Sequence, residues 1–465
     1  MSRRLKEYGL IGIGLVAGIL VSLQFSAVAD KDTELSLPVE ELRAFSEVFG
    51  RIKSDYVEPV SDKTLITSAI NGMLSGLDPH SAYLDADAFK ELQVGTQGEF
   101  GGLGIEVGME DGLVKVISPI EDTPAFNAGV KSGDLIIKLD DTLVKGLTLN
   151  DAVKRMRGKP GSSILLTIVR KNEPKPLQIS VTRAVIKVQS VKSKLAEPGF
   201  GFVRVTQFQE HTGENLATAL QNLQKQNNGP LQGLVLDLRN DPGGLLTGAV
   251  AVSAAFLPKD ALVVYTEGRT EDAKMRLTAS PDNYLRGSGK SDYLKDLPEA
   301  FKTVPMVVLV NGGSASASEI VAGALQDQKR AVIMGTQSFG KGSVQTILPL
   351  GNNTAIKLTT ARYYTPSGRS IQAKGIVPDI VVEDPATAGF DNAFRLREVD
   401  LDKHLSNSQG EDKSEPTAKP AKGQQTKAKD GDAGKVEVAE FGAKNDYQLN
   451  QALNLLKGMS ILRGK

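Results

Sequence analysis

The chain has 465 residues, 55 basic and 55 acidic side chains, no cysteine, no tryptophan and only three histidines. Without cysteine there is no disulfide, thiol nucleophile, iron–sulfur cluster or cysteine-ligated zinc. Three scattered histidines leave little room for a histidine-rich metal site, and a Ser-His-Asp triad would have to recruit one of them. The zero net charge argues against a general nucleic-acid binder. At roughly 100–200 residues per domain, the length predicts about two to four domains.

Residues 1–29 have the pattern of an export signal or a membrane anchor. Basic residues lie within the first six positions, an uncharged and mostly apolar run covers 10–25, and Ala27-Val28-Ala29 follows. This order is typical of a secretory signal cleaved after Ala29. The run is slightly short for a bilayer span, and a retained anchor is the second interpretation, with a buried helix as the third. The first two place the rest of the chain outside the cytoplasm.

Two regions follow the N-terminal segment. Residues 38–96 are predicted to be helical, because apolar side chains recur at three- and four-residue spacing, and a turn containing His80 follows the second helix. We expect His80 to be a structural, hydrogen-bonded residue. Residues 98–184 contain short strands, glycine turns and helices near 123–129 and 150–156, which predicts a small α+β domain.

From residue 200 onward, strands and helices alternate, which predicts an α/β core with crossover helices. Residues 267–298 are polar and are expected to form a surface excursion, whereas 354–382 return to strand-like sequence. Residues 404–440 lack large apolar side chains and are predicted to be a disordered linker. The predicted strands are 202–205, 234–238, 307–310 and 331–334, and the predicted helices are 213–226, 245–256 and 317–326.

A helix is predicted over 447–462. Leu449, Leu453, Leu456 and Met459 form an apolar stripe on it, suited to docking or self-association.

Two stretches of the α/β core carry the candidate chemistry. Residues 311–320 join a predicted buried strand to a helix through small residues and serines. A hydroxyl there could act as a nucleophile near free backbone N–H groups, or the serines could simply cap the helix. Lys341, flanked by glycines, is either a desolvated general base or an exposed loop lysine.

The stretch 335–341 nearly matches a phosphate-binding loop. Gly342 stands where a Mg²⁺-binding Ser or Thr is required, and a strand rather than a helix is predicted next. A nucleotide-hydrolysing function is therefore disfavoured.

Taken together, these motifs resemble the carboxyl-terminal processing proteases, also called tail-specific proteases, of the bacterial export compartment. That family uses a Ser/Lys dyad and requires no histidine. The resemblance implies an α/β multidomain fold: a helical N-terminal region, an inserted PDZ domain over 98–184, and a serine-protease core over 185–385 built from βαβ units like those of ClpP and crotonase. The matching stretches are residues 77–81, 100–105, 237–244, 314–319, 339–342 and 366–371.

The resemblance implies a role for individual residues. Ser316 matches the nucleophile, Lys341 the general base, and Gln345 the residue that positions the lysine. The backbone N–H groups of Ala317 and of Gly243 or Gly244 are the implied oxyanion donors. No cofactor and no metal are implied.

Gly102-Leu103-Gly104-Ile105 matches the PDZ loop that captures a terminal carboxylate, and the strand that follows offers an edge for peptide addition.

The resulting expectation is a serine endopeptidase of the periplasm or cell envelope, exported and either free or anchored in the inner membrane. It would recognise unstructured C-terminal tails of envelope proteins and cleave near them. An adaptor protein and self-association through the N- and C-terminal helical segments are expected, whereas nucleic acid is not. The alternative function is a catalytically silent PDZ scaffold of the envelope.

Overall fold

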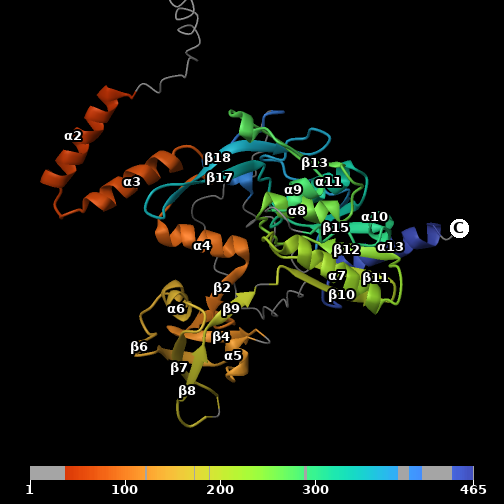
Figure 1. Cartoon of the computed structure of the whole chain (residues 1–465), viewed down its shortest axis with the longest axis horizontal. Helices are drawn as coiled ribbons and strands as arrows, with labels where there is room; N and C mark the ends of the chain where they lie inside the picture. The colour runs from red at the N-terminus through yellow and green to blue at the C-terminus, as the bar shows by residue number, and fades with distance from the viewer. Residues whose placement is uncertain are drawn as a thin grey trace, which may run out of the picture. The chain divides into compact units, whose positions relative to one another are not determined.

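The computed structural model describes residues 37–120, 123–171, 173–187, 189–286, 291–385, 397–410 and 442–463 (Figure 1). The chain divides into two units, residues 1–70 and 71–465. The predicted signal or anchor over 1–29 lies outside the described residues. Within the described part of the chain, no helix is both long and apolar enough to cross a membrane.

The described part of the first unit is helical, as predicted. It contains α2 (Val39–Asp55) and the start of α3 (Asp62–Ser75). No residue of α2 is buried, and Leu42, Phe45 and Val48 on its apolar stripe are exposed. Among residues 37–70 of this unit, nothing covers this apolar face.

The second unit includes a small domain whose core is a six-stranded sheet. The strand order is β3-β4-β5-β7-β8, with β6 paired to β5, so that β3 lies at the edge. A separate ribbon of β2 and β9 pairs the two ends of the domain. The elements are β2 (Glu99–Gly102), β3 (Ile105–Glu110), β4 (Leu113–Pro119), α5 (Pro124–Asn127), β5 (Leu135–Leu139), β6 (Thr142–Leu143), α6 (Leu149–Met156), β7 (Ser163–Val169), β8 (Leu177–Thr182) and β9 (Ala184–Lys187).

The larger part of the second unit is built on another six-stranded sheet, with the order β10-β11-β12-β15-β16-β19. All its pairs are parallel except β10 with β11, so helices cross over between the strands. The strands are β10 (Val191–Glu197), β11 (Phe200–Val205), β12 (Gly233–Asp237), β15 (Met306–Val310), β16 (Val332–Gly335) and β19 (Ile380–Val381), and the helices are α7 (Thr212–Gln226), α8 (Leu246–Ala254) and α11 (Ala317–Asp327).

Both faces of this sheet are covered, which explains the uninterrupted apolar runs of its central strands. On β12, Leu234 and Leu236 pack into the core formed with α7, α8 and α11, while Val235 packs into a second core with α13 (Tyr447–Arg463). Figure 1 shows these helices gathered around β12 and β15. The predicted α/β core is confirmed.

A second sheet of this part is antiparallel. β18 (Ala355–Tyr364) pairs with β1 (Ala82–Leu84), β13 (Leu262–Gly268) and β17 (Ser343–Pro349), and β13 also pairs with β14 (Arg276–Thr278).

The region predicted as a surface excursion, 267–298, is more structured than its polarity indicated. It contains β14, a 3₁₀ turn over Glu271–Ala273 and α9 (Pro281–Tyr284), and it buries Ala279 and Tyr284.

The C-terminal helix differs from the prediction in one respect. Leu449, Leu453 and Leu456 of its stripe are buried inside this same chain, so they do not form a free face for self-association. Arg239, which is 1% exposed and follows β12, also pairs with Asp446 at 2.6 Å.

The predicted linker starts later than expected. Asn407 donates a hydrogen bond to the carbonyl of Gln372 at 2.7 Å, and Gln409 accepts one from the N–H of Ser370 at 2.8 Å. Residues 404–410 therefore pack on the core, whereas 411–441 lie outside the described residues.

Candidate active site

Ser316 lies at the sharp turn between β15 and α11. It precedes the first residue of α11 and has φ 54° and ψ −112°, a backbone conformation that is strained for any residue other than glycine. Strained strand-to-helix turns of this kind hold nucleophilic serines in other hydrolases. The Ala317 N–H is the first of the helix, which has no acceptor within the helix itself.

The structure separates the three serines of this turn. Ser314 donates to the carbonyl of Leu238 at 2.8 Å, Ser318 donates to the carbonyl of Asp241 at 2.9 Å, and both side chains are fully buried. Ser316 is only partly buried. It is therefore the one serine of the three placed to meet a substrate.

Lys341 lies in the loop before β17. Its Nζ donates to Gln345 Oε1 at 2.5 Å. Burial lowers the pKa of Lys341 to about 8, and the positive charge of Lys357 contributes further. A lysine of this pKa is about one-tenth neutral at pH 7 and about half neutral at pH 8, and the neutral form is what a general base requires. The predicted contact between Lys341 and Gln345 is present.

A buried carboxylate joins the serine turn to the lysine loop. Glu319 Oε2 accepts the backbone N–H groups of Ser316 (2.8 Å) and Lys341 (3.0 Å), while Oε1 accepts the Ser338 hydroxyl (2.6 Å) and the Gly340 N–H (2.7 Å). Burial raises the pKa of Glu319 to about 7, although the four hydrogen bonds oppose this shift. The single oxygen Oε2 thus accepts a backbone hydrogen bond from each member of the predicted dyad.

Tyr363 on β18 is a further contact between the two segments. Its hydroxyl donates to the carbonyl of Lys341, and the Ser316 side chain acts to lower the pKa of that hydroxyl. Burial raises the pKa of Tyr363, so its phenol stays neutral and can donate.

The loop after β12 supplies the second wall of the site. A Cβ on Gly243 would lie 2.8 Å from Ala317 N and 2.8 Å from Ser316 Cβ, so only glycine permits this approach. The Gly243 N–H donates to Asp241 Oδ1 at 2.8 Å. Gly243 is therefore not the free oxyanion donor that was one of the two expectations, and Gly244 and Ala317 are left as the candidates.

The loop of the small domain that is predicted to bind a carboxylate also has a defined geometry. Gly104 has φ 78°, and a Cβ there would lie 2.2 Å from Thr123 Cβ. The carbonyl of Leu103 accepts the Ala125 N–H at 2.9 Å, and the Leu103 side chain belongs to the domain core. Ile105 then begins β3, the edge strand, which leaves one side of β3 for peptide addition.

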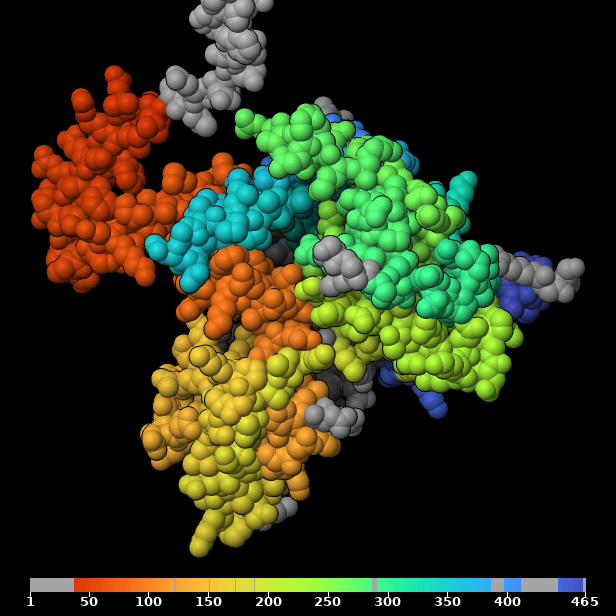
Figure 2. Space-filling model, viewed as in Figure 1, coloured from red at the N-terminus to blue at the C-terminus, as the bar shows by residue number. Residues whose placement is uncertain are grey.

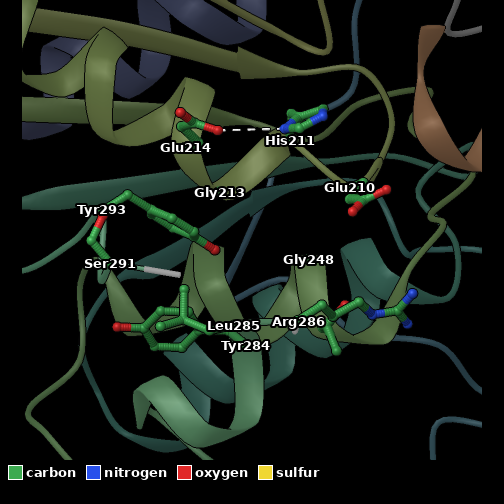
Figure 3. A pocket seen from close by; sticks show the side chains of 11 residues that line it. Glu210, His211, Gly213, Glu214, Gly248, Tyr284, Leu285, Arg286, Ser291 and Tyr293 are labelled. Carbon is green, nitrogen blue, oxygen red and sulfur yellow. Dashed lines mark hydrogen bonds and ion pairs between the residues drawn. The ribbon is translucent and has the colours of Figure 1, made fainter. Parts of the chain in front are cut away.

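A cavity of about 330 Å³ lies at the N-terminal ends of α7 and α8 (Figure 3). There, Nδ1 of His211 lies 3.4 Å from Oε2 of Glu214. Tyr284 and Tyr293 form part of the cavity wall. None of the predicted catalytic residues lines it. Among the described residues, no group of three or more His, Asp and Glu side chains is placed to hold a metal ion.

Sequence reasoning assigned no role to Glu319 or Tyr363. The position of Glu319, three residues after Ser316, is the spacing of a helix capping box, and this signal was available in the sequence. Tyr363 gave no comparable signal, because its contacts depend on the pairing of β17 with β18.

A partly exposed serine on a strained turn and a desolvated lysine, whose backbone N–H groups share one carboxylate, are the equipment of a serine-type peptidase. Residues 199–382 match peptidase family S41, 101–181 match the PDZ domain, and 19–88 match the N-terminal domain of the activating protease CtpB.

Relatives resemble nearly the whole chain. A carboxy-terminal-processing protease of Bartonella bacilliformis is 46% identical over 452 residues, which cover 96% of this chain and 95% of the relative. CtpB of Bacillus subtilis, a carboxy-terminal processing protease, is 35% identical over 385 residues, which cover 80% of this chain and 75% of CtpB. The solved photosystem II D1 C-terminal processing protease is 30% identical, with a TM-score of 0.41 over 73% of this chain and 86% of that chain. The chain belongs to the carboxy-terminal-processing proteases of peptidase family S41.

Proposed function

We propose that the protein is an exported serine endopeptidase that captures the C-terminal tails of proteins through its PDZ domain and cleaves near those ends with a Ser316/Lys341 dyad. The observation that carries the proposal is the sharing of Glu319 Oε2 by the backbone N–H groups of Ser316 and Lys341. This shared acceptor ties the backbone of the turn that carries Ser316 to the backbone of the loop that carries Lys341. The lowered pKa of Lys341 supports the same assignment.

The proposed reaction proceeds through an acyl-enzyme. Neutral Lys341 Nζ takes the proton of Ser316 Oγ as the oxygen attacks the scissile carbonyl carbon. The N–H groups of Ala317 and Gly244 stabilise the resulting oxyanion. The Lys341 ammonium then returns the proton to the leaving amine, and the C–N bond breaks. Water, deprotonated by Lys341, hydrolyses the Ser316 ester and releases the new carboxyl end.

The PDZ domain is proposed to select the substrate. A tail would add to β3 as a further strand, with its terminal carboxylate at the loop of Gly102, Leu103, Gly104 and Ile105. Unstructured tails of envelope proteins are the proposed substrates, and an adaptor is a proposed partner.

Self-association is proposed for the N-terminal unit alone. The exposed Leu42, Phe45 and Val48 of α2 give it an apolar face, whereas the stripe of α13 is buried.

The experiment compares the full chain with Ser316→Ala and Lys341→Ala variants on fluorescein-labelled casein, an unstructured protein. Ser193→Ala, which removes an exposed serine of β10, is the matched control. We expect cleavage by the wild type and the control but none by the two dyad variants. Variants that cut as well as the wild type would refute the dyad, and a wild type that binds tail peptides without cutting would favour the silent scaffold.

A further inference from the structure

The orientation of the Gln345 amide decides whether Lys341 can act as a base. With Oε1 toward Nζ, as in the structure, the glutamine accepts an N–H of the lysine and leaves its nitrogen lone pair available for the Ser316 proton. In the reversed orientation, the glutamine NH₂ group would donate to that lone pair. The base would then be occupied, although every residue of the dyad would still be present.

Two hydroxyl groups contact the other end of the amide. Gln345 Nε2 lies 3.0 Å from Ser343 Oγ and 3.1 Å from Thr359 Oγ1. A hydroxyl can donate or accept, so these contacts alone would tolerate either orientation. Thr359 Oγ1 also lies 3.1 Å from Asp78 Oδ1. An ionised carboxylate only accepts, so the Thr359 hydrogen points to Asp78 and its oxygen must accept from Gln345.

Asp78 is firmly held and stays ionised at neutral pH. It is 4% exposed and accepts the backbone N–H groups of His80 (2.8 Å) and Ser81 (2.9 Å) and the Ser81 hydroxyl (2.7 Å). Burial raises the pKa of Asp78, but the hydrogen bonds outweigh it, so the pKa lies below its ordinary value.

The turn that carries Asp78 leads into β1. This strand pairs with β18 in the register that places Ala82 opposite Lys357, and Ser81 Oγ accepts the N–H of Thr359 at 3.1 Å. Figure 2 shows orange atoms, the colour of the residues that follow β1, beside the cyan atoms of β17 and β18. The turn is therefore part of the same packed structure as the lysine loop.

We propose that Asp78 is a positioning residue for the general base: through the Thr359 hydroxyl, it holds Gln345 with its carbonyl oxygen toward Lys341 Nζ. This inference rests on the proposed function. It assigns to the turn at residues 78–81 a share in the reaction, although the turn lies more than 200 residues from Ser316 along the chain. Asp78 touches neither the substrate nor the reacting atoms, and no proton moves along the chain of hydrogen bonds.

The test uses Thr359→Val, which keeps the shape of the side chain and removes the hydroxyl, and Thr359→Ser, which keeps the hydroxyl. With the full chain and labelled casein, Thr359→Val is expected to lower kcat about tenfold with KM changed less than about twofold, because one net hydrogen bond is lost. Thr359→Ser should stay within about twofold of the wild type. Equal losses in both variants would show a packing role and overturn the proposal.

A second comparison tests the coupling to Asp78. Asp78→Asn should also lower kcat, and the double variant with Thr359→Val should be no slower than Thr359→Val alone, since both changes break one chain of contacts. Additive losses would overturn the proposal.

The pKa of Lys341 gives a readout that does not require catalysis. The charged groups that influence it are Lys357, Glu398, Glu319 and Asp78, and Thr359→Val leaves all four in place. The Lys341 pKa is followed by NMR of ¹³C-labelled lysine against pH. It should be lower in Thr359→Val than in Thr359→Ser, because the ammonium form loses an oriented acceptor. Equal values in the two variants would overturn the inference, whereas a wild type without protease activity would overturn the proposed function instead.

Discussion

Replacing Lys341 with methionine should make the protein more stable while abolishing its activity. In the folded protein burial lowers the pKa of Lys341 to about 8 from the ordinary value of 10.5. Between these two values the unfolded chain binds the proton more tightly, so this group makes stability rise with pH. Each pKa unit corresponds to about 1.4 kcal/mol, so that at pH 7 the charged lysine costs the folded state about 3 kcal/mol.

Methionine has a similar length and no charge to bury. The substitution also removes the hydrogen bond from Lys341 Nζ to Gln345, and this loss reduces the gain in stability by about 1 kcal/mol. We therefore expect a net gain of about 2 kcal/mol at pH 7. At pH 9.5 the unfavourable charge term is only about 1 kcal/mol, and the gain should nearly disappear.

The measurement is urea unfolding of the full chain followed by circular dichroism at pH 7 and pH 9.5. Both arms carry Ser316→Ala, which prevents self-digestion, and the comparison is with and without Lys341→Met. Lys192→Met, at an exposed position of β10, is the matched control and should change stability by less than about 0.5 kcal/mol. If Lys341→Met gives no gain at pH 7, or a gain that does not shrink at pH 9.5, then Lys341 is not desolvated and the argument for its role as a base is wrong.

Three further predictions concern the electrostatics and the backbone of the two sites. Lys357→Met should raise the pKa of Lys341 and move the alkaline rise of kcat/KM above pH 8; an unchanged pH profile would contradict the charge coupling. Glu319→Gln should lower the free energy of unfolding by about 2–3 kcal/mol in urea titrations, because its NH₂ group would face backbone donors, and wild-type stability would refute this. Gly104→Ala should weaken binding of a labelled peptide with a free C-terminal carboxylate at least tenfold in fluorescence polarisation. Gly112→Ala, at a similar φ but with open space for the Cβ, should bind as the wild type does, and equal weakening would mean that backbone strain alone is responsible.

The sequence predicts those features that depend on neighbouring residues. β12 and β15 are recognisable because both faces of their sheet are covered, which gives them the uninterrupted apolar runs Leu234–Leu236 and Met306–Val310. The apolar stripe of α13, which contains Leu449 and Leu453, is equally easy to recognise in the sequence. The surface that it packs against is not, because such a stripe fits a sheet of the same chain as well as another copy of the protein. The expectation of a Ser316/Lys341 dyad with Gln345 came from the resemblance to the carboxyl-terminal processing proteases.

What escaped prediction depends on contacts between distant segments. Asp78 and Thr359 meet across 281 positions because β1 pairs with β18, and polar residues of this kind carry no periodicity that would announce the contact. The choice between Gly243 and Gly244 likewise needed the position of the Asp241 carboxylate.

The attachment of α13 has a consequence for the integrity of the chain itself. Asp446 and Gln448 bind the buried Arg239 guanidinium, which directly precedes the glycine loop of the active site, and the apolar side chains of the helix fill one face of the central sheet. These non-covalent contacts would hold α13 on the sheet even if the chain were cut within 411–441. A protease molecule cut in that segment would persist as a two-fragment complex, running as two bands in denaturing gels and as one particle in native ones.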